Sequence, residues 1–137
     1  MLTKIELQTN KGESLVNITA KVRAAVQESG VQEGICVLYV PHTTGALMIN
    51  SGMDPNTARD VLEEIHRLVP TRADFHHIFD TPADASGHIK AILVGGSQTV
   101  IVTGGNLLLG SSQSIFFYEF DGPRKRQVSL RIMKDQD

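Results

Sequence analysis

The run Ile35-Cys36-Val37-Leu38-Tyr39-Val40 is apolar at nearly every position and rich in β-branched and aromatic side chains. A run that is apolar on both faces is typical of a strand at the centre of a sheet. Pro41 follows the run and cannot donate to a strand ladder, so we expect the strand to end there. Cys36 is the single cysteine, so no disulfide supports the fold, and its place in this strand predicts a buried thiol.

Segments on both sides of this run alternate apolar and polar residues or are rich in β-formers, which predicts further strands. They are residues 3–8, 43–50, 99–103, 107–109, 114–120 and 127–133. The turn sequence Asp121-Gly122-Pro123 is expected to join the last two segments as a pair of strands. Gly45 is expected to mark a bulge in the segment 43–50.

Helical patterns interrupt the strands. One amphipathic helix is expected over residues 17–30, with Asn17 as N-cap and Gly30 at the C-terminal end. A second is expected over residues 54–69, where an aspartate and a proline form a helix entry before an apolar stripe. The apolar segment 88–94 is short, and we interpret it as one or two helical turns.

These patterns together predict an α+β fold with an antiparallel, β-sandwich-like core and two amphipathic helices. The chain has 137 residues, and a chain of about 150 residues buries about 70% of its unfolded surface on folding. We therefore expect a single domain over residues 1–137.

Charge and hydropathy exclude some function classes. The 13 basic and 15 acidic residues give a net charge of −2, which argues against binding nucleic acid or an anionic membrane through a general positive field. The start of the chain is charged, unlike a signal peptide, and no apolar run approaches the roughly 20 residues of a membrane helix. We expect a cytoplasmic protein. P-loop, dinucleotide-binding and nucleophile-elbow motifs are absent from the sequence.

The segment Asp74–Lys90 holds three of the five histidines and reads as a loop because of its proline, glycine, serine and threonine content. Closing a loop of this size has a modest entropic cost, so His77 and His88 can meet. Together with His42 they give three imidazoles, which suit a divalent transition metal with an open water position. Ordinary loop histidines are the alternative.

Two acidic residues of this loop allow a different metal. Asp80 and Asp84 are candidate oxygen ligands for magnesium, or second partners that orient the histidines. Residues that cap a turn are an equally good interpretation of both. The sequence therefore predicts a divalent metal ion, with Mg²⁺ and Zn²⁺ both open.

Other residues are candidates for binding or orienting a substrate. Asn50 has an amide suited to orienting one, although an unbroken strand would separate it from His42 by about 26 Å. Turns containing Gly110, Ser111 and Ser112 expose backbone N–H groups and hydroxyls, as phosphate-binding nests do, but plain hairpins are more common. Cations that would neutralise a phosphate include Lys90 and Arg124.

Several of these motifs, taken together, resemble the YjbQ-like family. They are His42-Thr43-Thr44 leading to Asn50, His77, His88-Ile89-Lys90, Gly105-Asn106-Leu107-Leu108-Leu109-Gly110 with Gln113, and Glu119-Phe120-Asp121-Gly122-Pro123-Arg124 with Arg126. The resemblance runs from about Ile35 to Ile132. It implies a YjbQ-like α+β fold, a homotrimer, and the secondary thiamine-phosphate synthase activity described for the family.

That activity joins a pyrimidine diphosphate to a thiazole phosphate and releases pyrophosphate. The resemblance implies catalytic roles for His42, Asn50, His77 and His88. It also implies substrate contacts from Lys90, Gln113 and Arg124, and the turn residues Gly110, Ser111 and Ser112 are further candidates for substrate binding because of their exposed N–H groups and hydroxyls. Two positions depart from the family: Ser51, where a glutamate is common, and Ser112, where a tryptophan is common.

Two further functions stay open at this point. In one, a metal-dependent hydrolase uses water on a metal at His42, His77 and His88 to attack a small ester or phosphoester. In the other, the protein is a non-catalytic trimer that binds a small phosphorylated metabolite. The serines at 51 and 112 favour this last function, because a possible metal ligand and an aromatic stacking surface are missing.

Overall fold

The computed structural model describes residues 2–136, which form eight strands and three helices. The strands are β1 (Leu2–Gln8), β2 (Gly12–Asn17), β3 (Gly34–Tyr39), β4 (Gly45–Ser51), β5 (Ser97–Thr103), β6 (Asn106–Leu107), β7 (Gln113–Gly122) and β8 (Lys125–Lys134). The helices are α1 (Thr19–Ser29), α2 (Pro55–Leu68) and α3 (Pro82–Val94). The expected α+β fold is confirmed.

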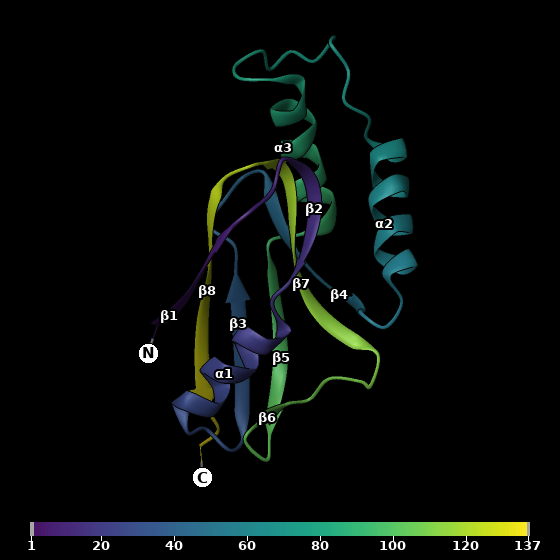
Figure 1. The fold of residues 1–137 in the computed structure, drawn as a ribbon. Coiled ribbons are helices and arrows are strands. Elements are labelled where there is room, and N and C mark those ends of the chain that lie inside the picture. Colours follow the sequence, from purple (N-terminus) through teal and green to yellow (C-terminus); the bar gives the residue numbers. More distant parts are fainter. Residues whose placement is uncertain (1, 137) are drawn as a thin grey trace.

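The strands form two antiparallel sheets (Figure 1). The larger has the order β1-β8-β3-β5-β6 and the smaller has the order β2-β7-β4. The run predicted to be a central strand is β3, which pairs with β8 on one side and β5 on the other. Its two buried side chains, Cys36 and Leu38, lie in the main core.

The main core fills the space between the two sheets and α1. It includes Val22 and Val26 from α1, Leu38 from β3, Phe117 from β7 and Leu130 from β8. Gly30 has φ 72°, a left-handed conformation that glycine adopts without strain, and it ends α1 as the sequence predicts.

A second apolar layer covers the other face of the smaller sheet. Tyr118 and Phe120 of β7 are buried there against the half-buried stripe of α2 and against α3. Asp54 caps α2, because its Oδ1 accepts a hydrogen bond from the N–H of Asn56 at 2.9 Å. The smaller sheet is therefore covered on both faces, and α3 lies directly on it (Figure 1).

Helix α3 corrects the prediction for the segment 74–90. Its second half is helical rather than loop, and the short turn expected at 88–94 is the end of a 13-residue helix. Thr81 is the N-cap, its Oγ1 accepting from the N–H of Asp84 at 3.3 Å, and Pro82 occupies the first helical position. These local signals outweigh the glycine and serine inside the helix, so the protein has three helices where two were expected.

Two strand predictions are also wrong. Gly45 does not mark a bulge, because the register between β4 and β7 is continuous from Gly45 to Ser51. A Cβ at this position would lie 2.6 Å from the ring of Phe117, so glycine is required by close packing. The turn at 121–123 does join β7 and β8, but these strands belong to different sheets and do not pair with each other.

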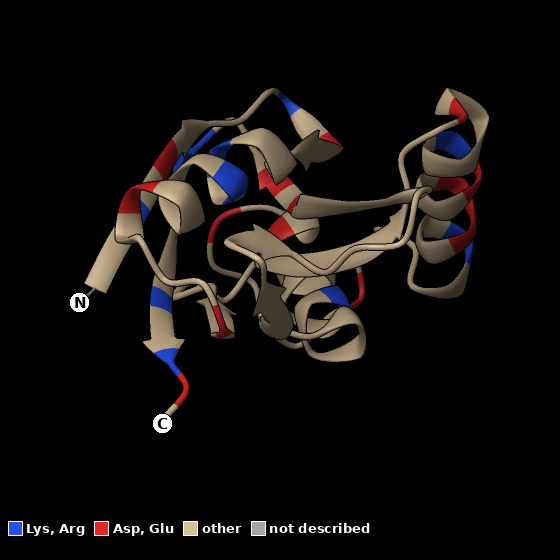
Figure 2. Ribbon diagram, turned by 90° about the horizontal axis from the view of Figure 1, so that it is seen from below, with Lys and Arg blue, Asp and Glu red and all other residues tan. Residues whose placement is uncertain are grey.

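Acidic and basic residues are interspersed along the ribbon, with both signs on α2 (Figure 2). None of the helices in residues 2–136 is both long and apolar enough to cross a membrane. The expectation of one domain over residues 1–137 stays a prediction.

Candidate metal centre

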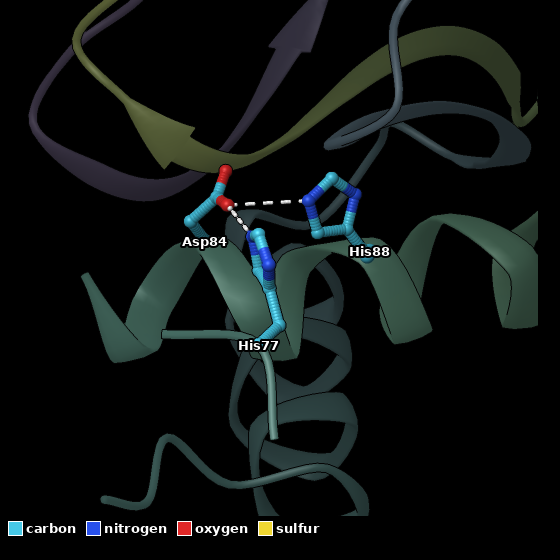
Figure 3. A group of neighbouring side chains, drawn as sticks. All are labelled: His77, Asp84 and His88. Carbon is cyan, nitrogen blue, oxygen red and sulfur yellow. Dashed lines mark hydrogen bonds and ion pairs between the residues drawn. The ribbon is translucent and has the colours of Figure 1, made fainter. Parts of the chain in front are cut away.

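Three side chains converge beside the N-terminal half of α3: His77, Asp84 and His88 (Figure 3). Oδ2 of Asp84 lies 2.7 Å from Nε2 of His77 and 3.2 Å from Nε2 of His88. One candidate ligand atom from each residue lies within 4.8 Å of the other two. The two imidazole rings are nearly perpendicular, with centroids 5.0 Å apart. The three donor atoms are close enough together to be a candidate site for one metal ion.

The position of each side chain follows from local structure. Asp84 and His88 are one turn apart on α3, so both lie on the same face of that helix. His77 reaches this face from the segment between α2 and α3, which is also held to α3 by the 3.4 Å contact between the hydroxyls of Thr71 and Ser86. Gly87 allows α3 to lie close to the smaller sheet, since a Cβ there would be 3.2 Å from Thr44.

Asp84 is buried, whereas His77 and His88 are partly open to solvent, with side chains 39% and 38% exposed. Burial raises the pKa of Asp84, but hydrogen bonds and positive charge from the two histidines outweigh it and hold the pKa below its usual value. The carboxylate is therefore ionised at neutral pH. The two histidines line separate cavities, of about 160 Å³ beside His77 and about 310 Å³ beside His88.

Arg124 is the cation associated with this group. Its pKa is raised, first by a hydrogen bond to Asp121 and further by the charges of Asp84 and Asp80. Nη2 donates to Oδ2 of Asp121 at 2.8 Å, and Nε donates to the backbone carbonyl of the same residue. The guanidinium is thus held by Asp121 within electrostatic reach of Asp84, and it remains partly exposed.

His42 does not join the group. Its Nε2 accepts a hydrogen bond from the backbone N–H of Gln127 at 2.9 Å. Burial, followed by the charge of Arg126, lowers the pKa of His42, and a ring that accepts a hydrogen bond at Nε2 is neutral. A neutral imidazole that accepts at Nε2 carries its proton at Nδ1 and has no nitrogen left for a metal. The expected ligand role of His42 is therefore corrected. It lines a cavity of about 310 Å³ together with His88.

Asn50 lies at the far end of β4 from Gly45, opposite Ser114 of β7. Its Oδ1 accepts from the N–H of Ser51 at 2.7 Å. Since β4 runs unbroken from Gly45 to Ser51, no bend brings Asn50 back towards His42 or α3. Within one chain, Asn50 does not share a site with His77 and His88.

The turn formed by Gly110, Ser111, Ser112 and Gln113 lies beside Asn50, not beside the metal group. Two hydrogen bonds close the turn: Oε1 of Gln113 accepts from the N–H of Gly110 at 2.8 Å, and the N–H of Gln113 donates to the carbonyl of Gly110 at 3.0 Å. The carbonyl of Ser112 accepts from the N–H of Gly52. The turn connects β6 of the larger sheet to β7 of the smaller one, so it is not the plain hairpin that was the alternative, and a phosphate nest there stays a prediction.

Lys90 is fully buried, and its ammonium pairs with Glu13 of β2 and lies 3.5 Å from Nδ1 of His66 on α2. A side chain enclosed in this way is not available to a substrate, which corrects its expected role. It follows His88 by two positions on α3, so it points away from the metal face and into the layer beneath α2.

From the sequence, Asp84 is a candidate metal ligand, a partner that orients the histidines, or a residue that caps a turn. The spacing Thr81-x-x-Asp84 before an apolar run is a helix-capping signal, and it would have placed Asp84 and His88 on one helical face. A second missed feature is the buried pair of Glu119 on β7 and Arg126 on β8, whose side chains are 0% and 5% exposed. No local pattern marks this pair, because its members come from different sheets.

The family model described as UPF0047 protein YjbQ-like matches residues 3–135. The chain belongs to this family. Among its relatives, a UPF0047 protein of Methanocaldococcus jannaschii is 44% identical, over 99% of this chain and 96% of the relative. UPF0047 protein YugU of Bacillus subtilis is 36% identical, over 97% of this chain and 99% of the relative.

Solved structures of the family have the same fold. A YbjQ-like protein of unknown function from Sulfolobus solfataricus has a TM-score of 0.92 and 29% identity, over 98% of this chain and 97% of that one. An uncharacterized conserved protein of the YjbQ/UPF0047 family from Clostridium acetobutylicum has a TM-score of 0.90 and 40% identity, over 96% and 99% of the two chains.

These comparisons confirm the resemblance to the YjbQ-like family but contradict the expected activity. The family and relatives are described without an assigned reaction, and thiamine-phosphate synthase activity is characteristic of a different family. The expected transferase function of this chain is therefore wrong. Enzymatic activity is not established for the UPF0047 family.

Proposed function

We propose that this chain binds one divalent transition metal ion through His77, Asp84 and His88, and that it hydrolyses a small phosphoester there. The observation that carries the proposal is the convergence of two imidazoles on one buried carboxylate oxygen, at 2.7 and 3.2 Å. Bringing three donors together without a ligand is unfavourable unless their charges are compensated, and here the histidines compensate Asp84.

The donor set favours zinc-type metals over magnesium. Imidazole nitrogens suit Zn²⁺ and related ions, whereas Mg²⁺ prefers oxygen ligands and retained waters. In a tetrahedral site with metal–ligand bonds of about 2.0 Å, two ligand atoms lie roughly 3.3 Å apart. Oδ2 of Asp84 lies at similar distances, 2.7 and 3.2 Å, from Nε2 of His77 and of His88. The two histidine nitrogens lie within 4.8 Å of each other, so the rings would move towards each other to bind one ion.

A metal with three protein ligands and an open position supplies Lewis acidity and lowers the pKa of bound water to about 7. The chain's own residues supply the rest. Asp84 would bring negative charge as the third ligand, and the cavity beside His88 would give room for a substrate. Arg124, close enough to interact electrostatically with Asp84, is suited to neutralise the charge of a phosphoryl group.

The first experiment measures metal binding. Purified protein is stripped with chelator, loaded with Zn²⁺, Mn²⁺ or Mg²⁺, and analysed for metal per chain and for affinity. We expect one tightly bound zinc per chain in the wild type and its loss in His77→Ala and His88→Ala. His76→Ala is the matched control, because His76 is exposed and outside the group. Equal zinc binding by all three variants would overturn the proposed site.

The second experiment measures hydrolysis of p-nitrophenyl phosphate, bis(p-nitrophenyl) phosphate and p-nitrophenyl acetate by the zinc-loaded protein. Activity on a phosphoester that disappears in His88→Ala supports the hydrolase. Zinc binding with no turnover of any of the three esters would reject the hydrolytic part and leave a metal-binding protein. The two parts of the proposal are therefore separable.

The homotrimer is also a proposal. In its support, Ile101, Ile35 and Met133 lie directly opposite one another across β5, β3 and β8, on the face of the larger sheet that points away from the core. Ile101 and Met133 are 54% and 50% exposed, and an apolar row of this kind is suited to contact a second copy. Ile101→Glu is expected to dissociate the assembly in analytical ultracentrifugation. A cytoplasmic location likewise stays a prediction.

A further inference from the structure

A second pocket lies beside strands β1 and β8. It has a volume of about 530 Å³, and its walls include Glu6 and Gln8 from β1, Lys125, Arg126 and Gln127 from β8, and His42. The members of the metal group do not line it. This pocket is therefore separate from the metal group.

Arg126 is the most unusual member of the wall. Its side chain is only 5% exposed, and its charge is balanced by Glu119, which accepts from Nε at 2.8 Å and from Nη2. Nη2 also donates to Oγ1 of Thr44 at 2.7 Å. Within residues 2–136, Nη1 has no hydrogen-bond partner. Two N–H donors of a fixed guanidinium therefore remain unused beside the pocket.

His42 also lines this pocket and carries a further N–H donor. Because its Nε2 accepts from the N–H of Gln127, the neutral ring carries its proton at Nδ1. Lys125 is exposed, and its ammonium gives the pocket wall a positive charge. The Glu119–Arg126 ion pair has no net charge and does not supply one. Glu6 is the one acidic residue of the wall and opposes this charge.

We propose that this pocket binds a tetrahedral oxyanion, either free phosphate or the phosphate group of a small phosphomonoester. Nη1 of Arg126 and Nδ1 of His42 would donate to its oxygens, and Lys125 would neutralise its charge. The volume of about 530 Å³ exceeds that of phosphate alone, so there is room for a small organic group. The proposal does not depend on the metal centre, although His42 also lines the cavity next to His88.

The test is a titration of the chelator-treated full chain with inorganic phosphate. Binding is monitored through the amide NMR signals of Arg126 and Gln127. Sodium chloride at the same ionic strength is the reference. We expect saturable shifts with phosphate that chloride does not reproduce. Lys125→Met is expected to weaken binding about two- to five-fold, and Glu6→Gln to tighten it by a similar factor, as for single exposed charges.

The control is Lys134→Met, which removes the same charge from the opposite end of β8 and is expected to leave binding unchanged. His88→Ala separates this pocket from the metal centre, because phosphate binding should persist in that variant. Shifts identical with chloride would indicate an ionic-strength effect only and overturn the proposal. Affinity that is insensitive to both Lys125→Met and Glu6→Gln, or that vanishes in His88→Ala, would also overturn it. Comparing phosphate with glycerol phosphate then distinguishes a free-anion site from a phosphomonoester site.

Discussion

Asp84 and His88 lie one turn apart on α3, with Oδ2 of the carboxylate 3.2 Å from Nε2 of the imidazole. The same oxygen meets His77, which precedes the helix, at 2.7 Å. One buried carboxylate therefore connects a loop histidine to a helix histidine.

Replacing Asp84 by asparagine keeps the shape of the side chain but removes its charge. We expect zinc affinity to fall at least about 10- to 100-fold, since losses of this size occur even when only an outer partner of a metal ligand is removed. Competition with a chromophoric chelator measures the affinity. Asp80→Asn is the control, because Asp80 lies just before the same helix but outside the group. Equal affinities for the two variants would contradict a ligand role for Asp84.

Metal binding is also expected to depend on pH. Despite its burial, Asp84 has a lowered pKa because of its hydrogen bonds to His77 and His88, so it stays ionised through the weakly acidic range. Because a metal binds imidazole only without its proton on the ligating nitrogen, bound zinc should decrease as the pH is lowered. Zinc content after equilibration and desalting at each pH measures this. A protein that keeps its zinc at about pH 5 would indicate a site dominated by carboxylates.

The buried pair of Glu119 and Arg126 is expected to control stability. Arg126→Met leaves Glu119 buried without its main partner, and removal of one member of a buried ion pair costs about 3–5 kcal/mol. The free energy of unfolding from urea denaturation measures this loss. Arg131→Met, an exposed position on the same strand, should change it by less than about 0.5 kcal/mol. Similar losses of unfolding free energy for both variants would contradict a special contribution of the Glu119–Arg126 pair to stability.

The same pair predicts an acid-sensitive contribution to stability. Burial raises the pKa of Glu119, but hydrogen bonds from Arg126 and Thr9 outweigh it, so the folded-state pKa lies below the usual 4.5. The stabilisation is fully present above the unfolded-state pKa and is lost as pH falls through the folded-state pKa. Urea denaturation from about pH 6 to about pH 3 should show a steeper loss for the wild type than for Glu119→Gln. Parallel curves would contradict this assignment.

Lys90 and Glu13 offer a double-mutant test of how α3 is held to the smaller sheet. Lys90 is fully buried, whereas the side chain of Glu13 is 22% exposed, so Lys90→Met is expected to lower the free energy of unfolding by about 2–4 kcal/mol. Adding Glu13→Gln should cost less in Lys90→Met than in the wild type, with a coupling of about 0.5–3 kcal/mol. Additive losses would mean that the two side chains do not stabilise each other. Lys11→Met, an exposed charge change beside β2, is the control.

Local sequence signals predicted most helices and strands, because their causes are local. The apolar run at 35–40 became β3, the aspartate and proline at 54 and 55 began α2, and Gly30 ended α1. The segment 12–17 was missed as a strand, since its mixed polar character has no clear period and its ladder is formed with β7. Partner choice depends on the whole chain, which is why β7 and β8 follow one another and still belong to different sheets.

The sequence by itself determined the α+β class, the family, and the pair of histidines at 77 and 88, because these depend on residue type, period and motif order. Only the tertiary structure decided which other residues accompany them. The rotation of α3 on the smaller sheet places Asp84 and His88 on the partly open face and buries Lys90. The meeting of β8 with the segment after β3 commits His42 to Gln127 instead of a metal. Both outcomes depend on contacts between residues distant in sequence, and the spacing of residues along a chain does not specify them.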